Sequence, residues 1–235
     1  MLHNLKALYG YKLAATNGEI GHIKDFYFDD YSWAVRYLVV DTGSWLTGRL
    51  VLIAPYAFGH LDADSRTLSV KLTNAQIEHA PSIDTHKPVS RQYEQDYYSY
   101  YGWPGYWSGG GLWGMGGYPV LLPAANTFGA RMDYVHREDP NLRSAVAVTG
   151  YHVETSSGDA GHVTDFKVND RSWSVRDLVV ETGHWYAGKE VLIPTDKVDR
   201  ISYPESKVYT SLSRGYSQYR RPPCGLGLSL TAWSR

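Results

Sequence analysis

Short apolar stretches separated by polar turns run through most of the chain. Residues 22–28 are rich in aromatic and β-branched side chains, residues 29–32 have the composition of a turn, and residues 33–41 form a long, mostly apolar run. Strands of this kind are predicted at 22–28, 33–41, 49–53, 66–72, 173–181, 190–193 and 207–212. A single capped helical turn is predicted at 73–78. Short strands without a long helical period are typical of an all-β barrel or sandwich.

The pattern of residues 18–53 occurs a second time at residues 158–193. The offset is a constant 140 residues without a gap, and 20 of the 36 positions are identical. The identical pairs include Gly21/Gly161, His22/His162, Asp25/Asp165, Ser32/Ser172, Trp33/Trp173, Arg36/Arg176 and Trp45/Trp185. Two copies are too few for a solenoid, in which each unit needs neighbours to bury its face. We therefore expect each copy to be a small domain with its own core.

The repeat divides the chain into four segments. They are repeat 1 at 1–86, an aromatic and glycine-rich connecting segment at 87–140, repeat 2 at 141–220, and a flexible tail at 221–235. The predicted fold class is all-β, with two small antiparallel β-barrels in tandem.

The connecting segment has an unusual composition. Residues 93–118 contain 10 aromatic side chains and 8 glycines. Disordered linkers are poor in aromatic residues, whereas so much glycine argues against a regular helix or strand. We expect its Tyr and Trp rings to lie over one or both barrels and cover apolar surface. The alternative is an exposed aromatic platform for a partner, with Tyr100, Trp103 and Trp107 as candidate binding residues.

Composition favours a soluble cytoplasmic protein. The net charge of −1 gives no electrostatic footprint for non-specific nucleic-acid or membrane binding. The single cysteine, Cys224, has no partner for a disulfide and cannot form a cysteine-based zinc site, which fits a reducing compartment. No stretch approaches the roughly 18 apolar residues of a membrane span, and the first residues lack the pattern of a signal peptide.

The repeated Asp and Arg suggest an ion pair within a hairpin. If residues 29–32 form a four-residue loop, Asp25 lies opposite Arg36, and the same count places Asp165 opposite Arg176. Opposite charges at facing strand positions stabilise a hairpin by roughly 0.2–1 kcal/mol. The structural interpretation is therefore a cross-strand ion pair. The functional alternative is an arginine that binds a carboxylate or phosphate of a partner.

The repeated His and Trp residues have structural and functional interpretations. His22 and His162 precede a strand, and we expect each to cap the turn at the neighbouring glycine, because no further ligands stand at metal spacing. Trp33 and Trp173 are predicted to lie in the core. Trp45 and Trp185 each fall in a glycine-flanked loop. The structural interpretation is a lid over the barrel end, and the functional alternative is part of a binding platform. His22, His162, Trp45 and Trp185 are therefore also candidate binding residues.

No motif for catalysis or a cofactor is present. The sequence has no phosphate-binding glycine loop, no nucleophile elbow and no His-Glu-x-x-His motif. We therefore expect no catalytic residues, no bound metal and no cofactor.

The repeat resembles the PRC-barrel domain. The resemblance rests on NGEIGHIKD at 17–25, W-x-VRYLVVD at 33–41, GR-x-VLI-x-P at 48–55 and LTNAQI at 72–77. Members of that family include the cytoplasmic domain of the photosynthetic reaction-centre H subunit and the C-terminal domain of RimM-type ribosome maturation factors. The resemblance implies a strongly bent antiparallel β-barrel that mediates protein assembly, with no catalytic residues to carry over.

These observations lead to one expected function and two alternatives. We expect a non-enzymatic bacterial protein of two PRC-type barrels that binds or assembles protein partners and forms a homo-oligomer. The first alternative is a small-molecule binder or enzyme that uses a cleft between the barrels. The second is a factor associated with ribosome or RNA maturation or with a photosynthetic complex, although the near-zero net charge makes nucleic-acid binding unexpected.

Overall fold

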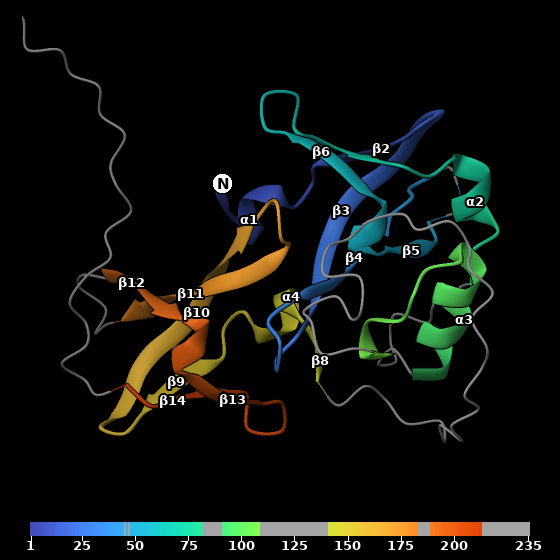
Figure 1. Cartoon of the computed structure of the whole chain (residues 1–235). Coiled ribbons are helices and arrows are strands. Elements are labelled where there is room, and N and C mark those ends of the chain that lie inside the picture. The colour runs from blue at the N-terminus through green and yellow to red at the C-terminus, as the bar shows by residue number, and fades with distance from the viewer. Residues whose placement is uncertain (45, 47, 82–90, 109–140, 183–188, 213–235) are drawn as a thin grey trace, which may run out of the picture.

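The computed structural model shows a mostly β protein with two seven-stranded sheets, one for each repeat (Figure 1). It describes all residues except 45, 47, 82–90, 109–140, 183–188 and 213–235. The predicted flexible tail, 221–235, therefore lies outside the described residues. The tandem, β-rich organisation predicted from the sequence is present.

The two sheets have the same strand order. In the first sheet the strands follow the order β5-β4-β3-β2-β7-β6, and in the second the order is β12-β11-β10-β9-β14-β13. The strands of the first sheet are β2 (Lys12–Ala15), β3 (Gly18–Asp29), β4 (Val35–Asp41), β5 (Leu50–Ile53), β6 (Phe58–Asp62) and β7 (Thr67–Val70). Those of the second are β9 (His152–Thr155), β10 (Gly158–Asn169), β11 (Ser174–Thr182), β12 (Lys189–Pro194), β13 (Val198–Ser202) and β14 (Lys207–Thr210).

The sheets differ from the predicted barrels in two respects. Among the described strands neither sheet closes on itself, and a 3-10 turn, η1 (Pro55–Ala57) or η4 (Thr195–Lys197), connects the two end strands of each sheet. The sheets are also mixed, because β2 pairs in parallel with β7 and β9 pairs in parallel with β14. Register shifts of the kind that β-bulges produce interrupt the pairing of both β3 and β10.

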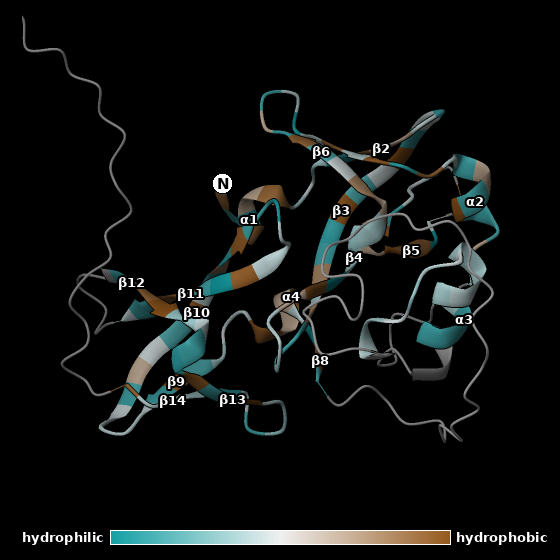
Figure 2. Ribbon diagram, in the orientation of Figure 1, coloured by the Kyte–Doolittle hydropathy of each residue, from teal (hydrophilic) through white to brown (hydrophobic). Residues whose placement is uncertain are grey.

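Local sequence explains the elements that were predicted correctly. Figure 2 shows β5 as uniformly apolar, whereas polar and apolar residues intermingle along β3. The predicted helical turn is α2 (Asn74–Glu78), where Thr73 and Gln76 form a complete capping box.

Each sheet contains one strand from the other repeat. Strand β1 (Leu2–Asn4), which leads into α1 (Leu5–Leu8), pairs with β10 in the second sheet. Strand β8 (Leu142–Ser144), which leads into α4 (Ala145–Val148), pairs with β3 in the first sheet. Figure 1 shows α1 beside β10 and β11, and α4 beside β3. The sheets therefore do not follow the sequence boundaries of the two repeats.

The prediction of two separate cores is wrong. The buried apolar side chains form one cluster that includes residues of both repeats, from Leu5 to Val208. The exchange of β1–α1 and β8–α4 explains this result, because each segment carries its apolar residues into the other repeat.

Candidate functional site: the junction between the repeats

The exchanged strands occupy equivalent places. Ser144 pairs with Tyr27 and Leu142 with Asp29, while Asn4 pairs with Lys167 and Leu2 with Asn169. Adding 140 to the repeat 1 residue and subtracting 140 from the repeat 2 residue converts the second set of pairs into the first, with the roles of the repeats reversed. The two repeats are therefore related by an approximate two-fold axis, as in a symmetric dimer.

The repeated aspartates bind the first turn of a helix from the other repeat. Asp25 accepts hydrogen bonds from the Ser144 hydroxyl and from the backbone N–H of Val146, the latter at 3.1 Å. Asp165 accepts the equivalent bond from the backbone N–H of Lys6 at 3.0 Å. N–H groups in a first helical turn have no partner within the helix, so these carboxylates satisfy them.

The predicted hairpin register is wrong in both repeats. Asp25 pairs with Val39 instead of Arg36, and Asp165 pairs with Val179 instead of Arg176. The turn is longer than the four residues assumed, because Phe28 pairs with Val35 instead of Trp33, and a register shift between Tyr27 and Phe28 displaces the count by one more residue. The repeated aspartate therefore joins the two repeats, instead of closing its own hairpin.

Burial raises the pKa of both aspartates. Asp25 is buried, and desolvation raises its pKa above the ordinary value, while the hydrogen bonds from Ser144 and Val146 oppose this change. Desolvation likewise raises the pKa of Asp165, and the Lys6 N–H opposes it. The pKa of Tyr9 is also raised, by its own burial and then by the negative charges of Asp25 and Asp165.

A second pair of identical aspartates binds basic side chains across the junction. Asp30 forms an ion pair with Arg143, with 2.8 Å between Oδ2 and Nε, and Asp170 contacts His3 at 3.0 Å between Oδ2 and Nε2. The backbone repeats this symmetry, because the N–H of Asp30 donates to Asn141 and that of Asp170 donates to Met1. Asp30 and Asp170 are not among the candidate residues predicted from the sequence.

The repeated tryptophans lie at the centre of the junction. The N–H of Val35 donates to the Trp173 carbonyl and the N–H of Val175 donates to the Trp33 carbonyl, each at 2.8 Å. An isolated antiparallel bridge pairs Ala34 with Ser174. These reciprocal bonds join the two sheets directly at the turns that follow β3 and β10.

Both tryptophans have a left-handed backbone, with φ of 58° for Trp33 and 47° for Trp173. Such a conformation is rare for a bulky residue. The turn holds it in place: the N–H of Trp33 donates to the Asp29 carbonyl, and Asp29 Oδ1 accepts from the N–H of Ser32 at 2.7 Å. Asn169 has the same role before Trp173.

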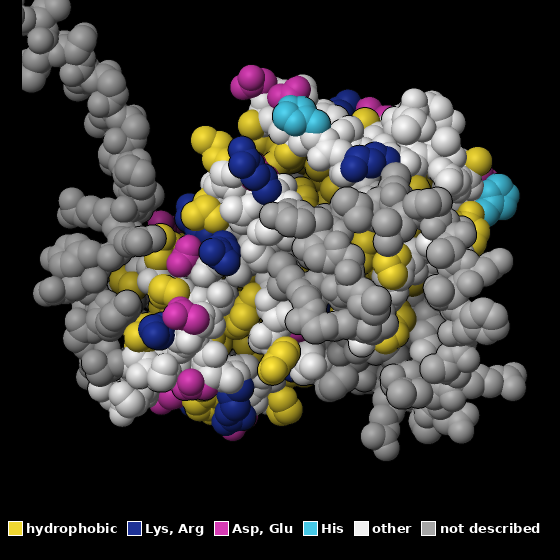
Figure 3. Space-filling view, viewed as in Figure 1, with side chains coloured by type: hydrophobic (Ala, Val, Ile, Leu, Met, Phe, Trp, Pro, Cys, Tyr) yellow, Lys and Arg dark blue, Asp and Glu magenta, His cyan; other side chains and the backbone are white. Residues whose placement is uncertain are grey.

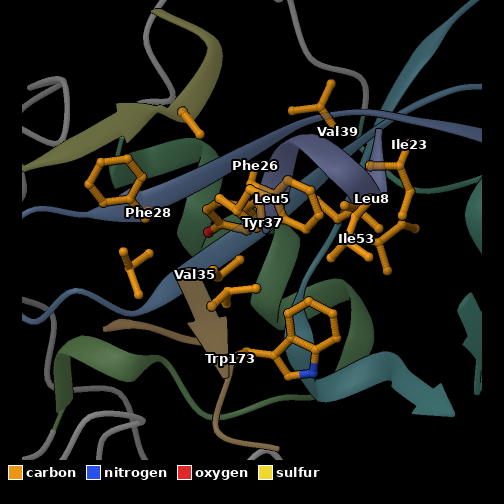
Figure 4. Close-up of a cluster of buried hydrophobic side chains, with 14 of the residues drawn as sticks. Leu5, Leu8, Ile23, Phe26, Phe28, Val35, Tyr37, Val39, Ile53 and Trp173 are labelled. Atoms are coloured by element: carbon orange, nitrogen blue, oxygen red, sulfur yellow. The ribbon is translucent and has the colours of Figure 1, made fainter. Parts of the chain in front are cut away.

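Aromatic side chains fill the space between the sheets. Trp173 packs against Phe26 and Phe58 of repeat 1, with ring centroids 6.4 and 4.6 Å away, and Phe28 packs against Phe166 at 5.3 Å. Figure 4 shows Trp173 among side chains that come mostly from repeat 1. The predicted core position is confirmed for Trp173, which is 3% exposed, while Trp33 is half-buried and stacks on Phe28.

Steric contact explains the repeated glycines. A Cβ atom on Gly21 would lie 2.0 Å from the Asp41 carbonyl oxygen, and one on Gly161 would lie 2.0 Å from that of Glu181. Gly21 lies inside β3 and Gly161 inside β10, so no turn exists there for the adjacent histidine to cap. His22 and His162 are both exposed on their strands, and His162 faces Glu181 at 3.6 Å.

The first part of the aromatic segment packs on repeat 1 as predicted, but it does so as a helix. Helix α3 (Arg91–Tyr101) contains no glycine and precedes η2 (Tyr106–Ser108). The buried hydroxyl of Tyr97 donates to the Leu52 carbonyl and accepts from the N–H of Ala54, both at 3.0 Å. The segment therefore satisfies the backbone at the end of β5.

A buried carboxylate of α3 and a buried guanidinium of repeat 1 both contact Tyr106. Glu94 accepts hydrogen bonds from Tyr37 at 2.8 Å and from Tyr106 at 2.6 Å. The Arg36 guanidinium lies 3.8 Å from the centre of the Tyr106 ring, and its Nη2 donates to Ser32. Burial and the adjacent Glu94 charge raise the pKa of Tyr37 well above its usual value. Arg36 is thus held inside the chain, whereas Arg176 is exposed.

The other candidate binding residues that the structure describes lie on α3, on η2 and between them. Trp103 is buried, Trp107 is half-buried, and both make edge-to-face contacts with Tyr98 in the aromatic cluster on repeat 1. Tyr100 is 43% exposed and donates to the Gln76 carbonyl. Trp45 and Trp185 lie outside the described residues.

Within the described part of the chain, no group of His, Cys, Asp or Glu residues could hold a metal ion. None of the helices described there has the length and apolar character needed to span a bilayer. Comparison of the chain with protein-family models and with curated proteins finds no match.

Proposed function

We propose that the chain is a non-catalytic, cytoplasmic bacterial protein that binds other proteins, built from two repeats of the PRC-barrel type. The observation that carries this proposal is the junction, where the residues shared by both repeats make contacts typical of a protein–protein interface. Asp25, Asp30, Trp33 and their counterparts join the repeats through hydrogen bonds, ion pairs and aromatic packing. A module whose shared residues recognise another folded surface is suited to assembly.

The geometry favours this proposal over a small-molecule site between the repeats. The rings of Trp173, Phe26, Phe28 and Phe166 pack together in the region where such a cleft was considered. Ligand pockets need a concave space with a few convergent polar groups, and the buried carboxylates there already bind backbone N–H groups.

The surface offered to a partner is chemically mixed. Figure 3 shows acidic and basic side chains interspersed over the described part of one face, in agreement with the net charge of −1. Two large aromatic side chains project strongly into solvent, Tyr31 at 87% and Tyr203 at 67% exposure. Exposed tyrosines are frequent anchors of protein interfaces.

Site-specific photo-crosslinking tests the proposal. A benzophenone amino acid replaces Tyr31 or Tyr203 in the full chain, and the buried Tyr97 position serves as the matched control. We expect irradiation in the host cell to give discrete protein adducts from the exposed positions, and excess untagged protein to suppress them. Binding of the partner identified in this way, prepared as a recombinant protein, to the purified chain is then measured directly. Adducts that do not respond to the competitor would contradict the proposal.

The homo-oligomer remains a separate prediction. It was motivated by the aromatic segment, yet Tyr97, Tyr98, Trp103 and Tyr106 are buried within the chain itself. The mass measured by light scattering at micromolar concentration decides between an oligomer and a monomer.

A further inference from the structure

We propose that each repeat carries a self-complementary docking surface whose partner is another copy of the same repeat. The surface consists of the exchanged strand and helical turn together with the repeated aspartates and tryptophan. In the intact chain the two surfaces are closed on each other. The proposal goes beyond a role in binding other proteins, because it states that the repeats pair homotypically.

The contacts across the junction are reciprocal. Asp25 with Val146 corresponds to Asp165 with Lys6, and Val35 with Trp173 corresponds to Val175 with Trp33. In an isologous interface the same patch is used by both partners, so each contact occurs twice. This is the arrangement that two separate copies of one module make.

A single repeat contains both halves of the reciprocal backbone and charge contacts. Repeat 1 supplies donors from His3, the Lys6 N–H and the Val35 N–H, and acceptors from Asp25 and Asp30. Two copies of repeat 1 would therefore place His3 against Asp30. Two copies of repeat 2 would place Arg143 against Asp170. Both combinations bring a basic side chain to a carboxylate, so neither homotypic pair meets repulsion at these positions.

The connection between the repeats explains why the intact chain pairs with itself. A covalent link gives the second repeat a high effective concentration near the first, which favours closure within one chain. Cutting this link removes that preference. The pairing of separate repeats then depends on the surfaces alone.

The experiment uses the full chain with a specific protease site inserted within residues 109–140, made in heavy- and light-isotope forms. Cleavage gives an N-terminal piece with β1 to α3 and a C-terminal piece with β8 to β14. The two cleaved forms are mixed at the lowest urea concentration at which heavy and light pieces exchange, returned to buffer, and weighed by native mass spectrometry. We expect pairs of one N-terminal and one C-terminal piece (N·C), together with pairs of two N-terminal pieces (N·N) and pairs of two C-terminal pieces (C·C).

A charge exchange supplies the matched control. Asp30→Arg combined with Arg143→Asp retains opposite charges in the N·C pair. In the C·C pair it places the carboxylate introduced at position 143 against Asp170 twice, and in the N·N pair it removes the carboxylate that meets His3. We expect the C·C fraction to fall at least about tenfold while the N·C pair persists.

The outcomes separate clearly. If heavy and light pieces exchange but form only N·C pairs, the proposal is overturned, because the pieces then dissociate without forming homotypic pairs. Pieces that remain single after return to buffer would also overturn it. Homotypic pairs that are insensitive to the charge exchange would show association through a different surface, which likewise contradicts it.

Discussion

At the scale of single residues, several of the side chains that are identical in the two repeats contact the other repeat. Trp33 and Trp173 illustrate this, because both adopt a left-handed backbone that costs of order 1–3 kcal/mol for a non-glycine residue. Their carbonyls accept the reciprocal bonds that join the sheets. The junction compensates the strain of the turn.

The two tryptophans should differ in their contribution to stability. We expect Trp173→Ala to lower the free energy of unfolding by about 3–5 kcal/mol, because a 3% exposed ring is removed from the aromatic core. Trp33→Ala should cost clearly less, since Trp33 is half-buried. Urea denaturation of both variants measures the difference. Equal losses would contradict the unequal packing.

The buried aspartates at the junction should make the free energy of unfolding depend on pH. Their folded-state pKa is raised, so the folded chain binds protons more strongly than the unfolded chain just above the ordinary carboxyl pKa of 3.8. Ionisation of Asp25 therefore opposes folding, and this effect disappears as pH falls through the folded pKa.

The Asp25→Asn variant measures the contribution of Asp25 ionisation to the free energy of unfolding. The free energy of unfolding of the wild type, relative to that of the variant, should rise as pH is lowered from 7 towards 4, because only the wild type gains a buried proton. Denaturation at several pH values provides the measurement, and Asp165→Asn should show the same direction. A pH-independent difference would contradict the raised pKa.

At the scale of elements, α3 distinguishes the two repeats. It packs on Tyr37 and Tyr56 of repeat 1, and the residues at the equivalent positions of repeat 2 are Asp177 and Asp196. That difference was visible in the sequence and indicates which repeat receives the aromatic helix. Glycine content averaged over 93–118 concealed the helix, because the glycines begin only at Gly102.

Two tyrosines of α3 form a matched test of its docking. Tyr97→Phe should cost about 1–3 kcal/mol, because the buried N–H of Ala54 loses its acceptor. Tyr100→Phe should cost less than about 0.5 kcal/mol, since its hydroxyl is at the surface. Unfolding free energies and amide exchange in residues 52–54 report the effect. A similar cost for both variants would show that the buried bond is unimportant.

Strand positions could be predicted, whereas strand partners could not. The predicted strand 49–53 matches β5 (Leu50–Ile53) closely, since apolar periodicity is a local signal. Pairing of β1 with β10 has no such signal, because the edges of β3 and β10 are nearly equivalent in sequence. Trp33 was assigned to a strand because Ser32-Trp33 gives no local sign of a left-handed turn.

At the scale of the whole molecule, the shared core predicts cooperative unfolding. One cluster of buried side chains spans both repeats, and each sheet includes a strand from the other. We expect calorimetry to show one transition, with equal calorimetric and van't Hoff enthalpies. Trp173→Ala should lower its midpoint without splitting it. Two resolved transitions in the wild type would indicate independent repeats.

The strand exchange also determines when the protein can fold during its synthesis. Lys6 meets Asp165, 159 residues further along the chain, and at about 5–20 residues per second that partner emerges roughly 10–30 s later. Until then the nascent chain carries Leu5, Leu8 and the unpaired edge of β3 without their covering surfaces. Translation speed and chaperone binding at the ribosome exit should therefore strongly influence how much native protein a cell obtains.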